Sequence, residues 1–513
     1  MPPDTSRGLS RRDVVKAAVA IGGTSALSAC LQWEGTAEAS EPEFPQGPED
    51  LSELPERQHA WGQYIVHDAH GNTVLPEHQV LLFLDYKGSG TPTEEDRETV
   101  EAALSTLDRA FQRGTGGDIG ASINRGLITM IGYSRSYFDR FDADLPGDID
   151  LQRPEDVLDA VGEDPEKADD YDALLLLTAD FGSILLSAEE ALFGDLDTVN
   201  GVDVEASLDG VFEKRERRTG VVGKGLPAEK LDEDRIPEHA PLSMGYKSGF
   251  RDSLPSEDAV TITGGPFDQA TTQAASRLRI DLGDWYDHDE ETRDDLMFST
   301  EHAHEDIGDT AEPLGGDSGV TEEMAENVEA HGEAHGRMGH TAKTARARND
   351  DFEPLILRRS EGVATDVAEE GVTGFNFTAV QEGIEDFIET RKAMNPEEYD
   401  ADVDDPHHGI IDYLETKSRA TFLVPPRPLR ALPSPRPEGG GTHGQFSVLR
   451  SPVAGPRARR ARRAVGLFRG RAGLRIQRRV GLRGRDRVRG PELRGTGIRR
   501  RERRLRNLRH RLQ

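Results

Sequence analysis

Residues 78–112 read HQVLLFLDYKGSGTPTEEDRETVEAALSTLDRAFQ and contain the first strand and the first helix that the sequence predicts. Residues 78–85 form a short, mostly apolar run, which is typical of a buried strand. Apolar residues then recur with helical spacing at Val100, Leu104 and Leu107, and acidic residues lie in the first turn, where the helix dipole favours them. The stretch therefore predicts a strand followed by a helix over residues 93–112.

The same alternation continues along the chain. Further apolar patterns predict strands over 126–134, 172–178, 210–216, 275–282 and 374–380, and helices over 184–192, 287–298 and 382–394. The order strand, helix, strand, strand, helix, strand is typical of a ferredoxin-like unit. We therefore expect an α+β fold of two ferredoxin-like halves, of the dimeric α/β-barrel type, over residues 57–240 and 241–400, although no sequence repeat is visible.

The net charge of −32 is unevenly distributed along the chain. Residues 1–418 hold 91 of the 95 acidic residues and 35 of the 63 basic ones, a net charge of −56. So large an acidic excess keeps a surface hydrated where salt screens the repulsion. It predicts a protein that works in high salt. The alternative, a partly disordered acidic protein, is disfavoured by the periodic apolar runs.

The N-terminus carries the features of an export signal. Two arginines at positions 11 and 12 precede a weakly apolar run, and the motif LSAC ends at Cys30, which is the one cysteine of the sequence. Twin arginines are typical of the twin-arginine export route, and LSAC is similar to a lipoprotein box. We expect a signal over 1–29, a lipid anchor at Cys30 outside the cytoplasmic membrane, and a flexible linker over 30–56. An ordinary cleaved signal is the alternative.

The C-terminal part of the chain has a different composition. Residues 419–513 hold 28 arginines, no lysine and four acidic residues. We interpret 401–437 as an extension of the folded part and 438–513 as a disordered tail. A nucleic-acid-binding tail is one interpretation, but aromatic residues are not interleaved. A shifted reading frame in a GC-rich gene is favoured, so no nucleic-acid partner is expected.

Residues 337–359, RMGHTAKTARARNDDFEPLILRR, combine a histidine with an arginine that follows an apolar run. The run over 355–357 is short and follows a proline, so it indicates a strand. This strand would carry Arg358 into the protein interior. A buried arginine is costly unless an anionic group meets it, so the sequence predicts an anionic partner near Arg358.

The order of motifs around this stretch resembles that of a known family. GYKSGFRDS at 245–253 is followed by SRLRIDLGDW at 276–285, then by His340, and then by LILRR at 355–359. This succession resembles the dye-decolourising (DyP-type) haem peroxidases, in which a GxxDG motif precedes an R-x-R-x-D-L strand, a haem-ligating histidine and an arginine. The resemblance covers about residues 75–400. It implies a haem b-dependent oxidoreductase that reduces hydrogen peroxide and oxidises a small-molecule electron donor, and a homo-oligomer is also compatible with it.

The resemblance implies a role for each matching residue. His340 would ligate the haem iron, because a neutral imidazole nitrogen is a good donor to iron. Asp252 would act as the acid–base group for bound peroxide, and Arg358 would stabilise charge on its oxygens. The remaining cofactor-binding positions of the loop are Gly249, Phe250, Arg251 and Ser253.

Two departures from the family pattern leave an alternative open. Ser253 stands where the family has its second glycine, which reduces the freedom of the backbone there. The carboxylate that usually supports the ligating histidine has only Glu382 and Glu385 as candidates. A haem-free, extracytoplasmic binding lipoprotein on the same fold is therefore the first alternative.

A histidine-rich segment supplies the second alternative. His331 and His335 have the spacing that places two imidazoles on one helical face, with Glu333 between them. They could bind zinc or copper. However, residues 301–334 are acidic and poor in apolar residues, so we expect a surface insertion without rigid support for a metal.

A few other residues are assigned from their surroundings. Trp285 and Tyr286 follow a predicted strand and are expected to pack against it, with electron relay as the alternative. His288, His407 and His408 lie in acidic, loop-like sequence and are expected at the surface.

Overall fold

The computed structural model describes residues 44–221, 244–302, 307–308, 310–364 and 372–437. The expected signal sequence, Cys30 and the arginine-rich tail lie outside these residues. No helix in the described part of the chain is both long and apolar enough to cross a membrane.

The N-terminal half is a ferredoxin-like unit. It consists of β3 (His78–Tyr86), α3 (Glu94–Ala110), β4 (Ile128–Tyr133), β5 (Ala173–Ala179), α6 (Gly182–Phe193) and β8 (Phe212–Val221). The strands pair antiparallel in the order β4-β5-β3-β8. Each element overlaps the strand or helix that the sequence predicts, and the order confirms the predicted unit.

The C-terminal half repeats this arrangement. Its strands are β9 (Thr271–Asp281), β10 (Leu357–Ala364), β11 (Val372–Gln381) and β12 (Leu414–Val424), and α14 (Ile384–Lys392) precedes the last strand. They pair antiparallel in the order β10-β11-β9-β12, the same topology as in the first half. The expected end of this half at residue 400 is wrong, because β12 lies within the predicted extension over 401–437.

The two halves join into one closed barrel of eight strands. β10 pairs with β8 through Val363 and Val221, and β12 pairs with β4 through Leu423 and Tyr133. The barrel has one layer of core inside it and another between its outer face and the helices, and successive side chains of β3 point alternately into the two layers. Leu81 and Phe83 lie in a cluster supplied by the barrel strands, and Leu82 lies in the outer cluster beneath the helices.

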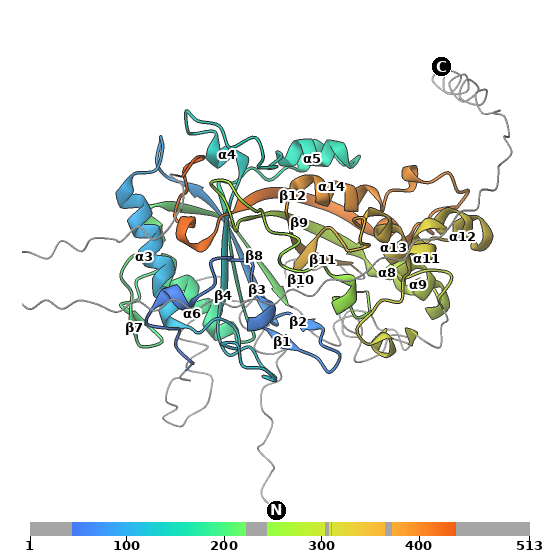
Figure 1. Ribbon diagram of the computed structural model, residues 1–513, viewed down its shortest axis with the longest axis horizontal. Helices are drawn as coiled ribbons and strands as arrows, with labels where there is room; N and C mark the ends of the chain where they lie inside the picture. Colours follow the sequence, from blue (N-terminus) through green and yellow to red (C-terminus); the bar gives the residue numbers. More distant parts are fainter. Residues whose placement is uncertain (1–43, 222–243, 303–306, 309, 365–371, 438–513) are drawn as a thin grey trace, which may run out of the picture. The chain divides into compact units, whose positions relative to one another are not determined.

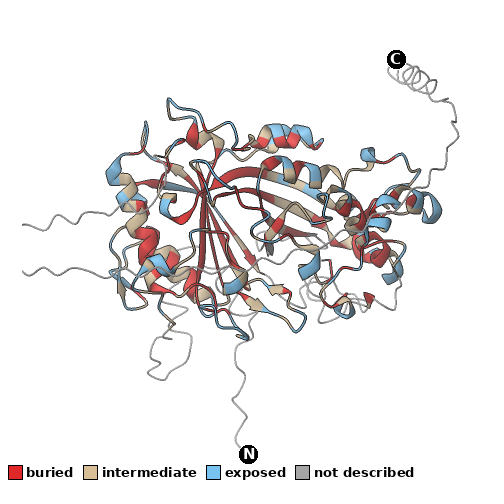
Figure 2. Cartoon of the chain, in the orientation of Figure 1, coloured by how far each residue is buried: buried red, intermediate tan, exposed pale blue. Residues whose placement is uncertain are grey.

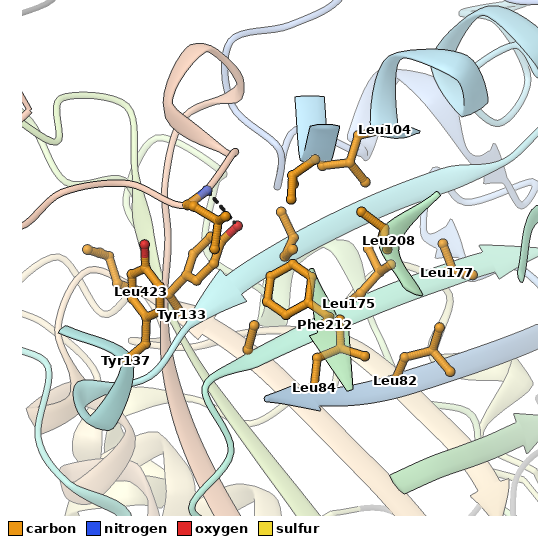
Figure 3. Packing of buried hydrophobic residues seen from close by; sticks show 14 of the residues in the cluster. Leu82, Leu84, Leu104, Tyr133, Tyr137, Leu175, Leu177, Leu208, Phe212 and Leu423 are labelled. Atoms are coloured by element: carbon orange, nitrogen blue, oxygen red, sulfur yellow. Dashed lines mark hydrogen bonds between the residues drawn. The ribbon is translucent and has the colours of Figure 1, made fainter. Parts of the chain in front are cut away.

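The outer core is the larger of the two. Figure 3 shows Leu82, Leu84, Leu175 and Leu177 projecting from neighbouring strands into the layer that also holds Phe212 and Leu208. Residues of α3 and α6 complete this layer, as the buried stretches in Figure 2 and the positions of both helices in Figure 1 show. Burial on both faces explains why β3 and β5 read as continuous apolar runs rather than alternating ones.

The connection from β9 to β10 contains the region that the sequence marks as functional. It contains α8 (Leu282–Asp287), α9 (Glu290–Met297), α11 (Glu322–Glu326), α12 (Val328–His335) and α13 (His340–Thr344), which lie near one another in Figure 1. The expectation of an unsupported insertion over 301–334 is corrected by α11 and α12. Ala325 and Val328 pack with Met338 and Ala342 in a small buried cluster.

The smaller elements complete the description. They are β1 (Val66–His67) with β2 (Thr73–Val74), β6 (Thr198–Val199) with β7 (Val202–Asp203), α4 (Arg135–Phe138) and α5 (Pro154–Ala160).

Candidate functional site

A cavity of about 580 Å³ lies on the outer face of the C-terminal half. Its walls come from β9, β11 and β12, from α14, and from the helices that connect β9 to β10. Most of the lining is apolar or aromatic and includes Phe250, Leu278, Ile280, Phe298, Phe375, Phe377, Phe387 and Leu414. A concave, mainly apolar cavity with a few polar groups is the usual form of a small-molecule or cofactor site.

Successive side chains of β10 point to opposite faces of the strand, and this decides whether Arg358 or Arg359 reaches the cavity. Leu357 packs in the cluster inside the barrel, and Arg359 is 2 % exposed and hydrogen-bonds the His59 carbonyl at 2.7 Å. Arg358, between them, points to the opposite face of the strand and lines the cavity. The fully buried arginine of the stretch is therefore Arg359, and its anionic partner is Glu257 at 2.5 Å. Arg358 is half-buried, on the cavity wall.

His340 reaches the cavity because the chain just before it runs very close to the end of α9. Gly339 caps α13, and a Cβ on this glycine would lie 2.1 Å from the carbonyl oxygen of Phe298. The amide of Ala342 donates to the same Phe298 oxygen at 3.0 Å, and Thr341 Oγ1 donates to Met297 O at 2.8 Å. The Gly-His pair of the sequence therefore allows α13 to pack closely against the end of α9, which places the imidazole on the cavity wall.

The His340 ring is uncharged at neutral pH. Burial lowers the pKa of His340 to about 3, and the positive charges of Arg358, Lys343 and Arg391 act in the same direction. Within the described residues, no side chain or backbone group hydrogen-bonds the His340 ring. The ring thus offers a neutral nitrogen donor to whatever occupies the cavity.

One part of the cavity wall carries a buried cluster of charges. Glu163 lies 2.9 Å from Arg391 and 2.6 Å from Arg419, and the Arg419 side chain is 2 % exposed. Arg419 also donates to Ser276 Oγ at 2.7 Å, while its Nε has no partner within the described structure. Two arginines on one carboxylate leave a net positive charge, which suits an anionic group of a ligand. These three residues were missed in the sequence because they lie far apart along it.

The structure does not place Asp252 in the cavity. Its side chain is 49 % exposed and forms a bidentate ion pair with Arg251, at 3.0 and 2.9 Å. The hydrogen bonds from Arg251 hold the pKa of Asp252 below its ordinary value. The predicted role of Asp252 as a cavity acid–base group is therefore corrected: an exposed, ionised carboxylate paired with arginine neither lines the cavity nor carries a proton at neutral pH.

The other four predicted positions of the loop differ in whether they line the cavity. Phe250 and Ser253 line the cavity, and Ser253 Oγ lies 2.8 Å from Ser318 Oγ. Gly249 has a φ of +74°, the left-handed conformation that favours glycine, but it does not reach the cavity. Arg251 is exposed and is also absent from the lining. Two of the four predicted loop positions thus border the cavity.

The predicted carboxylate partners of His340 lie elsewhere. Glu382 and Glu385 are exposed near the start of α14, and the Glu385 carboxylate accepts from Gln152 at 3.0 Å. Neither lines the cavity. The expectation that one of them supports His340 is wrong, because both side chains are exposed to solvent at the start of α14.

His331 and His335 lie on one face of α12 as expected, but the carboxylate beside them is Glu301 and not Glu333. His331 and His335 both approach Glu301, at 3.9 and 3.2 Å, whereas Glu333 is exposed. His408, expected at the surface, is 8 % exposed. Trp285 is buried and donates to the Met244 carbonyl at 3.0 Å, so packing accounts for it.

Comparisons with known proteins give a family and a set of similar folds. A family model described as "Family of unknown function (DUF7405)" matches residues 76–426, and no curated protein matches. A dye-decolorizing protein from V. cholerae is 11 % identical, with a TM-score of 0.44 over 72 % of this chain and 98 % of that one. The encapsulated DyP-type peroxidase from Mycobacterium smegmatis is 14 % identical, with a TM-score of 0.44 over 71 % and 97 %.

A third similar structure is a variant of DypB from Rhodococcus jostii in complex with heme, at 13 % identity and a TM-score of 0.43 over 72 % of this chain and 97 % of that one. Similarity at this level does not decide the chemistry of the cavity.

Proposed function

We propose that this chain, which belongs to the DUF7405 family of unknown function, is a haem b-binding oxidoreductase that reduces hydrogen peroxide and oxidises a small-molecule donor. The observation that carries the proposal is the His340 ring, uncharged and without a hydrogen-bond partner among the described residues, on the wall of a mainly apolar cavity.

The residues of the cavity fit haem b. His340 supplies one neutral nitrogen, the donor that haem iron takes in many proteins. The aromatic and aliphatic side chains of the lining suit the faces of a flat, apolar ring system. Arg391 and Arg419, with their surplus positive charge over Glu163, suit the carboxylates of such a group.

When bound, haem supplies a redox-active iron that accepts and passes on single electrons. Arg358 also lines the cavity and contributes a fixed positive charge and hydrogen-bond donors. It binds the oxygens of hydrogen peroxide and stabilises negative charge that develops on them. The apolar lining excludes water, and this strengthens the interaction between Arg358 and an anionic oxygen.

A second candidate function rests on the position of Asp252. With Asp252 outside the cavity, the carboxylates of its lining are Glu163, Asp164 and Glu415. Two arginines hold Glu163 ionised, because their charges lower its pKa. Because Asp252 lies outside the cavity and Glu163 is ionised, the site suits binding better than peroxide cleavage. The second candidate is therefore a haem-free binding protein for an apolar anion.

The cellular context is also a proposal. The twin arginines and Cys30 support export by the twin-arginine route and a lipid anchor outside the cytoplasmic membrane. The acidic excess of residues 1–418 supports a high-salt environment.

Titration of the purified protein with haem tests the cofactor. We expect a strong absorbance band of bound ferric haem in the wild type and its loss in His340→Ala. His335→Ala removes an exposed histidine of the same connection and serves as the matched control. Equal bands in all three proteins would contradict the assignment of His340, and no band in the wild type would leave the haem-free candidate.

Peroxide turnover by the haem-loaded protein tests the activity. Arg358→Leu is expected to lower kcat/KM for peroxide by roughly 10²-fold, as the loss of one charge-stabilising donor does elsewhere. The haem band should persist in this variant, and Arg358→Lys should recover part of the rate. Turnover in Arg358→Leu equal to that of the wild type would exclude this role.

A further inference from the structure

The loop that precedes β12 brings together three side chains that are suited to a metal ion. They are Asp405, His408 and Asp412. The Nδ1 atom of His408 lies 3.1 Å from Asp405 Oδ1 and 3.7 Å from Asp412 Oδ2. One ligand atom of each residue lies within 4.8 Å of the other two. The cluster lies outside the lining of the cavity described above.

The imidazole at the centre of this cluster has an unsatisfied nitrogen. His408 is 8 % exposed, and its Nδ1 makes no hydrogen bond within the described structure, although two carboxylates lie beside it. Buried polar atoms nearly always have a partner, so an exception needs an explanation. A ligand placed among the three side chains supplies that partner.

The two carboxylates are also positioned to contact a ligand beside His408. The side chain of Asp412 is 14 % exposed and is oriented by the backbone amide of His408, which donates to its Oδ2 at 2.8 Å. Asp405 is 85 % exposed, so one side of the cluster is open to water. Metal–ligand bonds of about 2.1 Å place neighbouring ligand atoms roughly 3.0–3.4 Å apart. The separation of His408 Nδ1 from Asp405 lies in this range at 3.1 Å, and that from Asp412 exceeds it by a small amount at 3.7 Å.

We propose that Asp405, His408 and Asp412 bind a divalent transition-metal ion, with water completing its coordination on the exposed side. One imidazole nitrogen and two carboxylate oxygens form a mixed donor set that suits Zn²⁺ or Mn²⁺ better than Mg²⁺ or Ca²⁺, which prefer oxygen alone. Zn²⁺ binds such sites more tightly than Mn²⁺. Affinity therefore falls from Zn²⁺ to Mn²⁺ to Mg²⁺.

The position of the loop gives the ion a structural role. A Cβ on Gly409, which has a φ of +77°, would lie 3.0 Å from the amide nitrogen of His340. The buried Lys343 donates to the His408 carbonyl at 2.8 Å, and the Met338 amide donates to the His407 carbonyl at 2.9 Å. An ion at this cluster would hold the loop against the turn that positions His340. The binding itself does not depend on haem.

Calorimetric titration of the chelator-treated, untagged full chain with ZnCl₂ tests the proposal. The double variant His331→Gln/His335→Gln serves as the background, because those histidines meet at Glu301. We expect one bound Zn²⁺ per chain, and roughly tenfold or greater loss of affinity in Asp405→Asn and in His408→Gln, since even an outer-shell partner of a metal contributes that much.

Asp404→Asn is the matched control, an exposed carboxylate one residue away. It should leave the Zn²⁺ affinity unchanged. Asp405 is exposed, so its substitution leaves the fold intact, and circular dichroism checks this. Hydrogen exchange of residues 404–413 should slow on Zn²⁺ addition in the background protein but not in Asp405→Asn.

Equal affinities in Asp404→Asn, Asp405→Asn and His408→Gln would overturn the proposal, as would the absence of Zn²⁺ binding in the background protein. His340→Ala separates this result from the haem proposal. It should abolish the haem absorbance band while retaining the Zn²⁺ isotherm, so either proposal can fail without the other.

Discussion

Arg358 and Arg359 are consecutive on β10 yet point to opposite faces of the strand, Arg358 to the cavity and Arg359 to the protein interior. Arg359 contacts Glu257 at 2.5 Å and lies over the Trp61 ring, 5.1 Å from its centroid. Glu257 also accepts from the amides of Trp61 and Gly62, at 2.6 and 2.7 Å. Arg359 thus connects β10 to the N-terminal segment, whereas Arg358 borders the cavity.

Arg359→Met is expected to destabilise the protein by about 2 kcal/mol, because it removes the charge-assisted hydrogen bonds of the buried guanidinium to the half-buried Glu257 and to the His59 carbonyl. Urea denaturation measures the loss. Arg251→Met, which breaks the exposed pair with Asp252, should cost much less stability, because water screens an exposed ion pair. Similar losses in the two variants would show that the Arg359–Glu257 pair does not stabilise the fold.

Asp252→Asn is expected to leave haem binding and peroxide turnover close to those of the wild type. The carboxylate is half exposed and paired with Arg251, and it does not line the cavity. Steady-state kinetics of the haem-loaded variant measures this directly. A fall in turnover of roughly 10²-fold or more, the size expected for loss of a catalytic acid–base group, with the haem band retained, would show that Asp252 moves into the cavity when the cofactor binds.

Gly339→Ala should both destabilise the protein and weaken haem binding. The new Cβ would lie 2.1 Å from the Phe298 carbonyl oxygen, a backbone atom that cannot move independently. Overpacking of this kind costs about 1–3 kcal/mol, and the shift would carry His340 away from its position. Thermal melting and haem titration measure the two effects.

Gly182→Ala is the control for that substitution, because nothing lies within 4 Å of a Cβ at this position in α6. It should be neutral or slightly stabilising. If Gly339→Ala melts at the same temperature as this control, the close approach between α13 and Phe298 does not constrain the protein.

The free energy of unfolding should fall on acidification from about pH 6.5 toward pH 3. Burial lowers the pKa of His340 and of His59 to about 3, whereas unfolded histidine titrates near pH 6.5. Between these values the unfolded chain binds more protons than the native one, so stability rises with pH, by about 1.4 kcal/mol per unit for each such histidine.

Denaturation of the haem-free protein at pH 7 and pH 5 measures this dependence. His340→Leu keeps an apolar side chain at the cavity and should reduce the difference between the two pH values. His335→Leu, at an exposed position, should leave it unchanged. An undiminished difference in His340→Leu would show that the native ring takes up a proton in this range.

Much of the fold could be predicted from the sequence because its local patterns agree with the tertiary structure. The apolar run at 78–85 and the helical spacing after it give β3 and α3, and the repeated element order gives both ferredoxin-like halves. β12 lies in the predicted extension over 401–437, for which the sequence patterns predict no strand. Only pairing with β9 and β4 identifies it as a barrel strand.

The candidate site, like the fold, could be predicted only in part from the sequence. The sequence by itself determined that His340 follows a glycine and that Arg358 follows a short apolar run, at the start of a strand, so both residues are placed by local chain geometry. Only the tertiary structure decided that Asp252 pairs with Arg251 outside the cavity, that Glu163 meets Arg391 and Arg419, and that His408 is buried between two carboxylates. Those contacts depend on side-chain direction and on segments distant in the chain, which residue spacing does not encode.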